Sequence, residues 1–297
     1  MDRIDAMQAF VAAADLEGFA PAARKLGLSP SAVTRLIAAL EERLGARLLQ
    51  RTTRQVTLTD AGSRYLERAK RILADVEEAE QAIEGERTRP GGRLVISAPV
   101  GFGRLHVSPV VSAYLKRFPE VAADLRLSDR MINLVEEGVD LAVRIGHLPD
   151  STLVVRHVGE MRRIVVASRD YLKAHGEPKR PAEIASHETI QFGAMTAAPE
   201  WRFVEDGRAV SASPSPRFSS NSADAAIQHA EAGGGLTRVL AYQAAASLKA
   251  GRLKIVLAKF EQPPLPIHIV YPTSRLLSAK VRTFIDLVTE IADWHFG

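Results

Sequence analysis

Four positions on one face of an expected helix carry side chains that suit contact with the edges of nucleic-acid bases. The helix is expected over Pro30–Leu44, and Ser31, Thr34, Arg35 and Ala38 form one stripe along it. Short hydroxyls and one guanidinium can hydrogen-bond base edges, and such a stripe is narrow enough for a major groove. An ordinary solvated helix would carry longer charged residues there. The pattern therefore favours DNA contact, above all by Arg35, with a plain solvated face as the alternative.

The start of this helix has its own sequence signal, and a turn separates it from a shorter helix. A helix at 21–26 leads into the turn Gly27–Ser29. Ser29 suits the N-cap and Pro30 the first helical position, so both belong to the expected interface. The positions opposite the stripe should face a core, namely Val33, Ile37, Leu40 and Leu44.

A small basic hairpin is expected after the helix ends at Gly45. Gln55–Leu58 alternates polar and apolar residues as a half-buried strand does. Arg51, Thr52 and Arg54 would lie in the preceding turn, where phosphate or minor-groove contact is natural, although the arginines could be ordinary exposed cations. Seven cations against two acids between Arg24 and Arg54 give the local charge that phosphate contact needs. Helices followed by such a hairpin predict a winged helix-turn-helix.

A long helix with a heptad pattern is expected from Thr59 or Asp60 to about Glu86. The spacing alternates between four and three residues over Tyr65, Ala69, Ile72, Val76, Ala79 and Ile83. This seam predicts pairing with a second copy of the chain. The alternative is a helix that packs on its own chain. Pro90–Gly92 ends the helix and marks a linker.

From Arg93 onward strands and helices alternate, which predicts an α/β domain with an open, largely parallel sheet. The expected strands are 94–98, 123–127, 141–145, 163–168, 201–204, 236–238 and 267–271. The expected helices are 105–118, 131–137, 222–232 and 280–295.

Ligands of such sheets bind beyond the carboxyl ends of strands, at helix N-termini. The backbone amides of Val100, Gly101 and Phe102 follow the first strand and could receive a carboxylate. The other polar groups at strand ends or helix starts are Ser128, Asp129, Arg144, Asn221, Thr237 and Arg238. Asn221 could be a helix cap, a ligand contact or both. If Arg144 or Arg238 points inward, an anionic ligand such as an aromatic or aliphatic carboxylate is favoured.

Composition removes several other classes of protein. The chain has no cysteine, which excludes disulfides, thiol catalysis, cysteine-bound zinc and peroxide sensing through a disulfide. Its eight histidines lack metal-ligand spacing, and no nucleophile elbow, P-loop or full dinucleotide motif occurs. We therefore expect no catalytic residue, no metal and no cofactor. No apolar run approaches the ~20 residues that cross a membrane, and the N-terminus does not resemble a secretion signal, so a cytoplasmic protein is expected.

The motifs together resemble the LysR-type transcriptional regulators over essentially the whole chain. The N-terminal part of the resemblance lies in 19–29, 31–35, 40–54 and 58–62, and the C-terminal part in 92–99, 134–142 and 144–146. Many family members carry Gln, Ser and Gln where Pro30, Thr34 and Leu36 stand. Because Gln can pair bidentately with adenine and Pro cannot, the readout of a half-site stays open.

The resemblance implies a winged helix-turn-helix at 1–58, a linker and dimerisation helix at 59–89, and an effector-binding domain at 90–297. That domain would resemble periplasmic solute-binding proteins, with subdomain I at 90–162 and 267–297 and subdomain II at 163–266. A small-molecule effector would bind between the two, and Ser128 matches a hydroxyl that contacts inducers in the family. Dimers that pair into tetramers would occupy a dyad-symmetric operator, and effector closure would alter DNA bending or RNA polymerase contact.

Two other classes compete with a regulator. An enzyme or a solute-binding protein could be built on the C-terminal half, but the secretion signal and catalytic constellation are missing. An architectural DNA binder would protect DNA without sequence register and would show a steep salt dependence.

Overall fold

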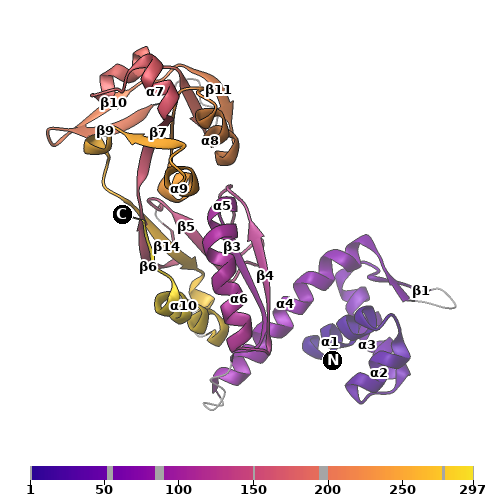
Figure 1. Cartoon of the computed structure of the whole chain (residues 1–297). Helices are drawn as coiled ribbons and strands as arrows, with labels where there is room; N and C mark the ends of the chain where they lie inside the picture. Colours follow the sequence, from indigo (N-terminus) through magenta and orange to yellow (C-terminus); the bar gives the residue numbers. More distant parts are fainter. Residues whose placement is uncertain are drawn as a thin grey trace. The chain divides into compact units, whose positions relative to one another are not determined.

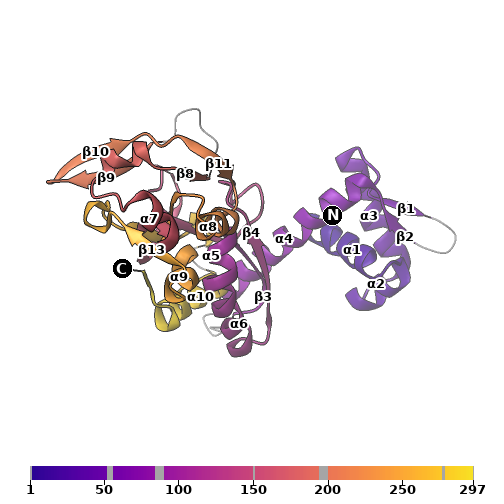
Figure 2. The ribbon, with the colours of Figure 1, turned by 45° about the horizontal axis from the view of Figure 1, so that its top comes forward.

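The computed structural model describes residues 2–51, 56–83, 90–149, 151–193, 200–275 and 278–296. The chain forms two compact units, Met1–Gly92 and Arg93–Gly297, and each is described by itself. Figures 1 and 2 show the ribbon in two views. Within the described residues no helix is both long and apolar enough to cross a membrane. The expected domain boundaries stay predictions.

The first unit is a helix-turn-helix with a hairpin, as the sequence predicts. Its elements are α1 (Arg3–Asp15), α2 (Phe19–Leu26), α3 (Pro30–Leu44), β1 (Leu49–Arg51), β2 (Val56–Leu58) and α4 (Asp60–Ile83). The hydroxyl of Ser29 accepts a hydrogen bond from the amide of Ala32 at 3.2 Å, and Pro30 is the first helical residue. β1 and β2 pair antiparallel.

The core of this unit lies between α1, α3 and the start of α4. Val33, Ile37 and Leu40 are buried as predicted, whereas Leu44 is 43% exposed. The prediction for Leu44 is wrong because that residue lies in the last turn of α3, where Gly45 already redirects the chain. α1 contributes mainly alanines and Phe10 to this core.

The start of α4 packs on its own chain. Tyr65 lies 5.6 Å from Phe10 between ring centroids, and Ala69 is fully buried. The ammonium of Lys70 contacts the Asp15 carboxylate at 2.6 Å. The first two positions of the predicted seam are thus used within one copy, while Ile72 is 41% exposed. The side chains of the last two seam positions lie outside the described residues, so pairing with a second copy stays a prediction.

One sheet of the second unit has six strands in the order β15-β6-β14-β5-β3-β4. Its strands are β3 (Gly92–Ala98), β4 (Val121–Leu127), β5 (Leu141–Ile145), β6 (Val154–Met161), β14 (Leu265–Tyr271) and β15 (Trp294–Phe296). The helical segments that belong with it are α5 (Val100–Phe102), the π-helical turn η1 (Gly103–Val107), α6 (Ser108–Arg117), the 3₁₀ turn η4 (Thr273–Arg275) and α10 (Ala279–Ile291). β14 is antiparallel to both β5 and β6, so the sheet is mixed rather than largely parallel.

The other sheet has five strands in the order β11-β8-β12-β7-β13. Its strands are β7 (Arg163–Ser168), β8 (Thr189–Phe192), β11 (Pro216–Ser220), β12 (Leu236–Leu240) and β13 (Leu253–Val256). The remaining elements are α7 (Arg169–His175), η2 (Pro181–Ser186), β9 (Trp201–Glu205), β10 (Arg208–Ala212), α8 (Ala223–Glu231), α9 (Ala241–Lys249) and η3 (Ala258–Phe260). β12 and β13 both run antiparallel to β7, so this sheet is mixed as well.

The chain passes twice between the two sheets, and one ion pair joins the two passages. β6 ends in the six-stranded sheet at Met161, and β7 begins in the other sheet two residues later. The chain returns between η3 and β14 (Figure 1). Arg162 in the first passage binds Glu261 in the second through both carboxylate oxygens, at 2.8 and 3.0 Å. This two-pronged contact fixes the two passages side by side.

Two expected helices differ in the structure. Residues 131–133 have no regular structure and 134–138 form a turn, because the Asn133 side chain accepts hydrogen bonds from the amides of Val135 and Glu136 and so competes with a helix. The closing helix ends at Ile291 rather than near His295. Trp294, only 2% exposed, then starts strand β15, which pairs parallel with β6. Burial of this tryptophan decides the change from helix to strand.

Candidate nucleic-acid interface and ligand pocket

The outer face of α3 has the composition that the sequence predicts. Ser31, Arg35 and Ala38 are exposed, and Thr34 is half-buried. The Ser29 hydroxyl, besides capping the helix, lies 3.0 Å from the hydroxyl of Ser31. Small polar groups and one guanidinium thus share a solvent-facing stripe that begins at the helix N-terminus. Contact of these residues and of Pro30 with DNA stays a prediction.

Exposed cations lie on α2, along α3 and just after α3. Arg24, Arg35, Arg43 and Arg47 are exposed, and in the described part of the chain none of them lies within ion-pair distance of a carboxylate. Their charges are therefore open to an external anion such as a phosphate. The side chain of Arg51 and the whole of Thr52 and Arg54 lie outside the described residues.

Glu41 joins α3 to the hairpin, a role that sequence analysis did not predict. One of its carboxylate oxygens accepts hydrogen bonds from the amides of Leu48 and Leu49, at 2.7 and 3.0 Å. These bonds fix the entry to β1 against α3. The sequence shows Glu41 only as one of two acids in a basic stretch, and no local spacing reveals its partners.

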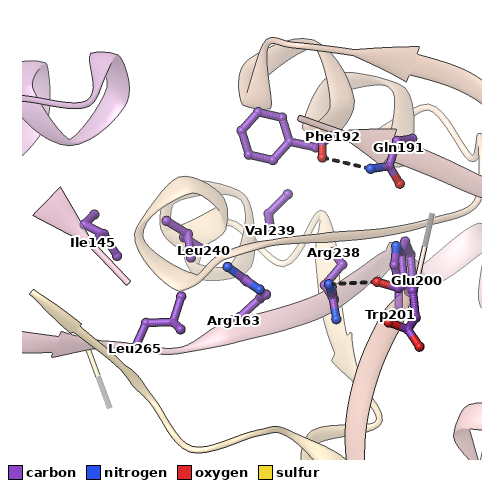
Figure 3. A pocket seen from close by; sticks show the side chains of 10 residues that line it. All are labelled: Ile145, Arg163, Gln191, Phe192, Glu200, Trp201, Arg238, Val239, Leu240 and Leu265. Carbon is purple, nitrogen blue, oxygen red and sulfur yellow. Dashed lines mark hydrogen bonds between the residues drawn. The ribbon is translucent and has the colours of Figure 1, made fainter. Parts of the chain in front are cut away.

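A pocket of about 270 Å³ opens between the two sheets of the second unit. Figure 3 shows its lining, which comes from β5, β7, β8, β9, β12, β14 and the residue before β9. The lining residues are Ile145, Arg163, Gln191, Phe192, Glu200, Trp201, Arg238, Val239, Leu240 and Leu265. Its volume is just below the range of pockets that hold drug-sized ligands, so it suits a smaller molecule such as a metabolite.

Two guanidinium groups face this pocket. Arg238 lies over the ring of Trp201 at 5.8 Å and donates to the carbonyl of Arg202 at 3.2 Å. Burial first, and then the charges of Arg163 and Arg202, lower the pKa of Arg238 to about 10. The residue Arg163 is exposed, yet partial burial of its guanidinium lowers the pKa of this group as well.

Glu200, the carboxylate that lines the pocket near these arginines, already pairs with another residue. The carboxylate of Glu200 contacts the guanidinium of Arg202 at 2.9 Å. A hydrogen bond from Ser211 and contact with Arg202 lower the pKa of Glu200. Among the described residues no carboxylate forms an ion pair with Arg163 or Arg238. The pocket therefore presents an excess of positive charge.

The expected cradle after β3 already holds a carboxylate that belongs to the chain. The amide of Val100 donates to the carboxylate of Asp129 at 3.0 Å. A Cβ on Gly101 would lie 2.9 Å from the hydroxyl of Tyr242, so any larger residue would require that tyrosine to shift. The side chain of Phe102 is fully buried, 5.4 Å from the ring of Tyr242 between centroids. One of the three amides predicted to receive a ligand carboxylate, that of Val100, thus binds a carboxylate of the chain itself.

The other predicted ligand residues are spread over both sheets. Ser128 uses its hydroxyl to accept a hydrogen bond from the amide of Arg130, at 3.1 Å. Thr237 is fully buried and donates to the carbonyl of Ile190. Asn221 is exposed, and the cap of α8 is Ser222, whose hydroxyl accepts from the amide of Ala225; the prediction of Asn221 as cap is therefore wrong.

Only Arg238 of the predicted set lines the pocket, and sequence analysis missed the residues around it. Arg163, Gln191 and Trp201 come from segments whose meeting depends on the packing of strands far apart in sequence. One signal was present, because Arg163 follows the predicted passage between subdomains and precedes an apolar strand. In the part of the chain that the structure covers, no cluster of histidine and acidic residues could hold a metal.

Two family models match the chain. The model of the bacterial regulatory helix-turn-helix protein, lysR family, matches residues 4–63, and the LysR substrate binding domain matches residues 87–293. An HTH-type transcriptional regulator of Xanthomonas campestris is 36% identical, with 95% of this chain and 83% of the relative covered. An HTH-type transcriptional repressor of Pseudomonas aeruginosa is 32% identical, with 98% and 92% covered.

Solved structures agree with these relatives. CrgA, a LysR-type transcriptional regulator from Neisseria meningitidis, is 30% identical with a TM-score of 0.62, and the match covers 97% of this chain and 99% of CrgA. The full-length virulence activator AphB of Vibrio cholerae is 27% identical with a TM-score of 0.62, covering 98% and 99%.

Proposed function

Since the chain belongs to the LysR-type transcriptional regulators, DNA-binding proteins with a substrate-binding effector domain, we propose that it binds a dyad-symmetric operator as a homo-oligomer and responds to an anionic effector. The family consists of regulators rather than enzymes. The observation that supports an anionic effector is that two guanidinium groups without a carboxylate partner among the described residues line the pocket between the sheets.

The proposed DNA contacts follow from the exposed stripe of α3. Arg35 would pair with a base edge or a phosphate, and Ser31 and Thr34 would contact neighbouring base edges in the major groove. Ser29 and Pro30 would place the helix N-terminus near the backbone, and the hairpin residues Arg51, Thr52 and Arg54 would contact phosphates. A dimer or tetramer formed through α4 would set the separation of the half-sites.

The proposed effector site is the pocket that Arg163 and Arg238 share. A carboxylate or phosphate there would neutralise both guanidinium groups, and Phe192, Trp201 and Leu240 would contact its apolar part. Gln191 adds a buried side-chain oxygen that has no hydrogen-bond partner among the described residues. A ligand hydroxyl or amine could donate to it. Val100, Gly101, Phe102, Ser128, Asp129, Arg144, Asn221 and Thr237 stay predictions as effector residues.

Effector binding would act by shifting a population of conformations. An anion that contacts both sheets favours arrangements in which they lie close, provided that its affinity differs between two states. The paired passages at Arg162 and Glu261 are where such a change in angle would be absorbed. DNA bending or contact with RNA polymerase would then report the change, in the cytoplasm where the chromosome lies.

Substitution of Arg35 tests the DNA interface. Arg35→Ala should weaken specific operator binding by roughly 1–3 kcal/mol if the guanidinium contacts a base. Arg68→Ala, an equally exposed arginine on α4, is the matched control and should bind as the unsubstituted protein does. Gel-shift titrations at fixed salt measure both. Equal affinities for Arg35→Ala and the control would refute the role of Arg35.

A ligand screen tests the effector site. Thermal unfolding in the presence of small carboxylates, phosphates, amines and neutral compounds should give stabilisation by anions. Arg163→Gln should reduce that stabilisation, because it removes one of the two charges on the pocket. A screen that finds only neutral or cationic ligands would reject an anionic effector while leaving DNA binding untouched.

A further inference from the structure

Three buried polar atoms for which no described residue supplies a hydrogen bond lie on one face of the six-stranded sheet. They are the hydroxyl of Ser97 on β3, one terminal guanidinium nitrogen of Arg144 on β5 and the Nδ1 atom of His268 on β14. Arg144 is directly opposite His268, and Ser97 is opposite Ala142, two residues before Arg144. Residues opposite each other or two apart share a face. The three unpartnered groups therefore form one row across neighbouring strands.

Arg144 differs from Arg162 and Arg275, which pair with carboxylates, and it is more deeply buried than Arg163 and Arg238, which do not. Arg275 contacts the buried carboxylate of Asp140 at 3.1 Å, and Arg162 binds Glu261 through two contacts. Arg144 is only 8% exposed, yet among the described residues no carboxylate lies within ion-pair distance of it. A buried guanidinium keeps its proton, so it needs a negative partner.

Glu137, the acid whose charge acts on Arg144, does not supply that partner. Glu137 is exposed on the turn that replaces the expected helix. Burial lowers the pKa of Arg144, and the charge of Glu137 opposes this lowering without a direct contact. A buried water could accept a hydrogen bond from the guanidinium, but it would leave the charge uncompensated. The row thus has a positive charge without a carboxylate to compensate it.

The cover over this face limits the size of a partner. Val95, Leu134, Val139, Ala142 and Val270 form a buried cluster on the same face. The pocket between the sheets is a different place, because its lining includes Ile145, the next residue along β5, whose side chain points to the opposite face and packs on the other cluster. A partner of Arg144 must be small enough to fit under apolar side chains.

We propose that Arg144 binds a small monovalent anion, either a halide or a one-carbon carboxylate, with the hydroxyl of Ser97 and a ring N–H of His268 as further donors. A guanidinium beside a hydroxyl and a ring N–H that can both donate suits an anion, and the charge of the anion would compensate the guanidinium inside the sheet. The site is independent of the effector pocket and would be occupied with or without an effector.

Chloride-dependent unfolding of the full chain tests the site. Chloride replaces methanesulfonate at constant ionic strength, and a parallel series uses formate. Trp201 and Trp294, the only tryptophans of the sequence, both lie in the second unit, so their fluorescence reports its unfolding. The midpoint should rise by roughly 3–5 °C for each tenfold increase of anion above its dissociation constant. The steeper of the two series identifies which anion the site prefers.

Two variants assign this dependence to one of the two arginine sites. Arg144→Met should remove the dependence on chloride and formate, whereas Arg238→Met, which alters only the effector pocket, should keep it. The reverse pattern would place the anion in the effector pocket and overturn the proposal. A flat midpoint in the unsubstituted protein would overturn it equally, without bearing on the effector pocket.

Bromide gives a direct test that does not depend on whether Arg144→Met folds. Crystals of the unsubstituted full-length protein, soaked in bromide, should give an anomalous peak in contact with the Arg144 guanidinium. The absence of a peak at Arg144, with bromide bound at other surface cations, would overturn the proposal.

Discussion

Replacement of Arg238 by methionine should stabilise the second unit while it weakens anion binding. The pKa of Arg238 is lowered from 12.5 to about 10, chiefly by burial. A lowering of this size corresponds to roughly 3 kcal/mol against the charged form. Since the side chain is only half-buried, screening by water leaves about 1–2 kcal/mol of that cost. The folded protein bears this cost for as long as the pocket holds no anion.

The loss of favourable contacts offsets part of this gain. Arg238 lies over Trp201, a contact worth about 0.5–1 kcal/mol at a site of this kind. Its hydrogen bonds to the carbonyls of Arg202 and Glu200 are long, 3.2 and 3.4 Å. The net gain for Arg238→Met should be about 1 kcal/mol, which raises the unfolding midpoint by roughly 2–4 °C. Anion affinity should fall by roughly 10- to 150-fold, because a charge-assisted hydrogen bond is worth about 1.5–3 kcal/mol.

Differential scanning calorimetry without ligand, and titration calorimetry with the anion from the screen, measure the two effects. Arg217→Met, which removes an arginine with an 82% exposed side chain, is the control and should change the midpoint little. A midpoint that falls by several degrees in Arg238→Met, with anion affinity unchanged, would show that Arg238 supports the fold and that the pocket charge has no binding role.

Two further outcomes follow from individual contacts. Gly62→Ala should destabilise the first unit by about 1–3 kcal/mol, because the new Cβ would lie 2.0 Å from the carbonyl oxygen of Leu48. Urea unfolding followed by circular dichroism measures this loss. An unchanged unfolding midpoint would contradict the close approach of Gly62 to Leu48. Burial raises the pKa of Tyr114 and of Tyr242 to about 12, above the unfolded value of 10.0, so the folded state favours the neutral phenols. Their stabilising contribution is complete below pH 10 and disappears as pH rises through about 12. The midpoint of thermal unfolding should fall between these pH values, and it should fall less steeply in Tyr242→Phe. Equal slopes of midpoint against pH in the variant and the unsubstituted protein would contradict the raised pKa of Tyr242.

The first unit could be predicted from sequence because its signals are local. Ser29 caps α3, Pro30 begins it and Gly45 follows its end. These three local signals define both ends of the helix without information from distant parts of the chain. The same reasoning fails for Leu44. Its helical spacing matches the buried positions, but the core ends one turn earlier, at Leu40. Periodicity gives the face of a helix and does not show how far the core extends along it.

The pocket could not be predicted because it depends on which strands become neighbours. Gln191 and Arg238 lie on β8 and β12, which are adjacent only through the order of the five-stranded sheet. Strand-end logic selected both Thr237 and Arg238, yet alternation along β12 places one in the core and the other on the pocket. Without the strand register, the sequence does not distinguish the buried residue from the one on the pocket.

The contact between Val100 and Asp129 makes the chain its own competitor at that amide. A tethered carboxylate acts at an effective concentration in the millimolar range or above, so a free carboxylate at micromolar levels would rarely displace it. Any metabolite that did so would release Asp129 and loosen the link between the segment after β3 and the one after β4. Such a site would not bind the ligand at low concentration and would be occupied only when the ligand is abundant.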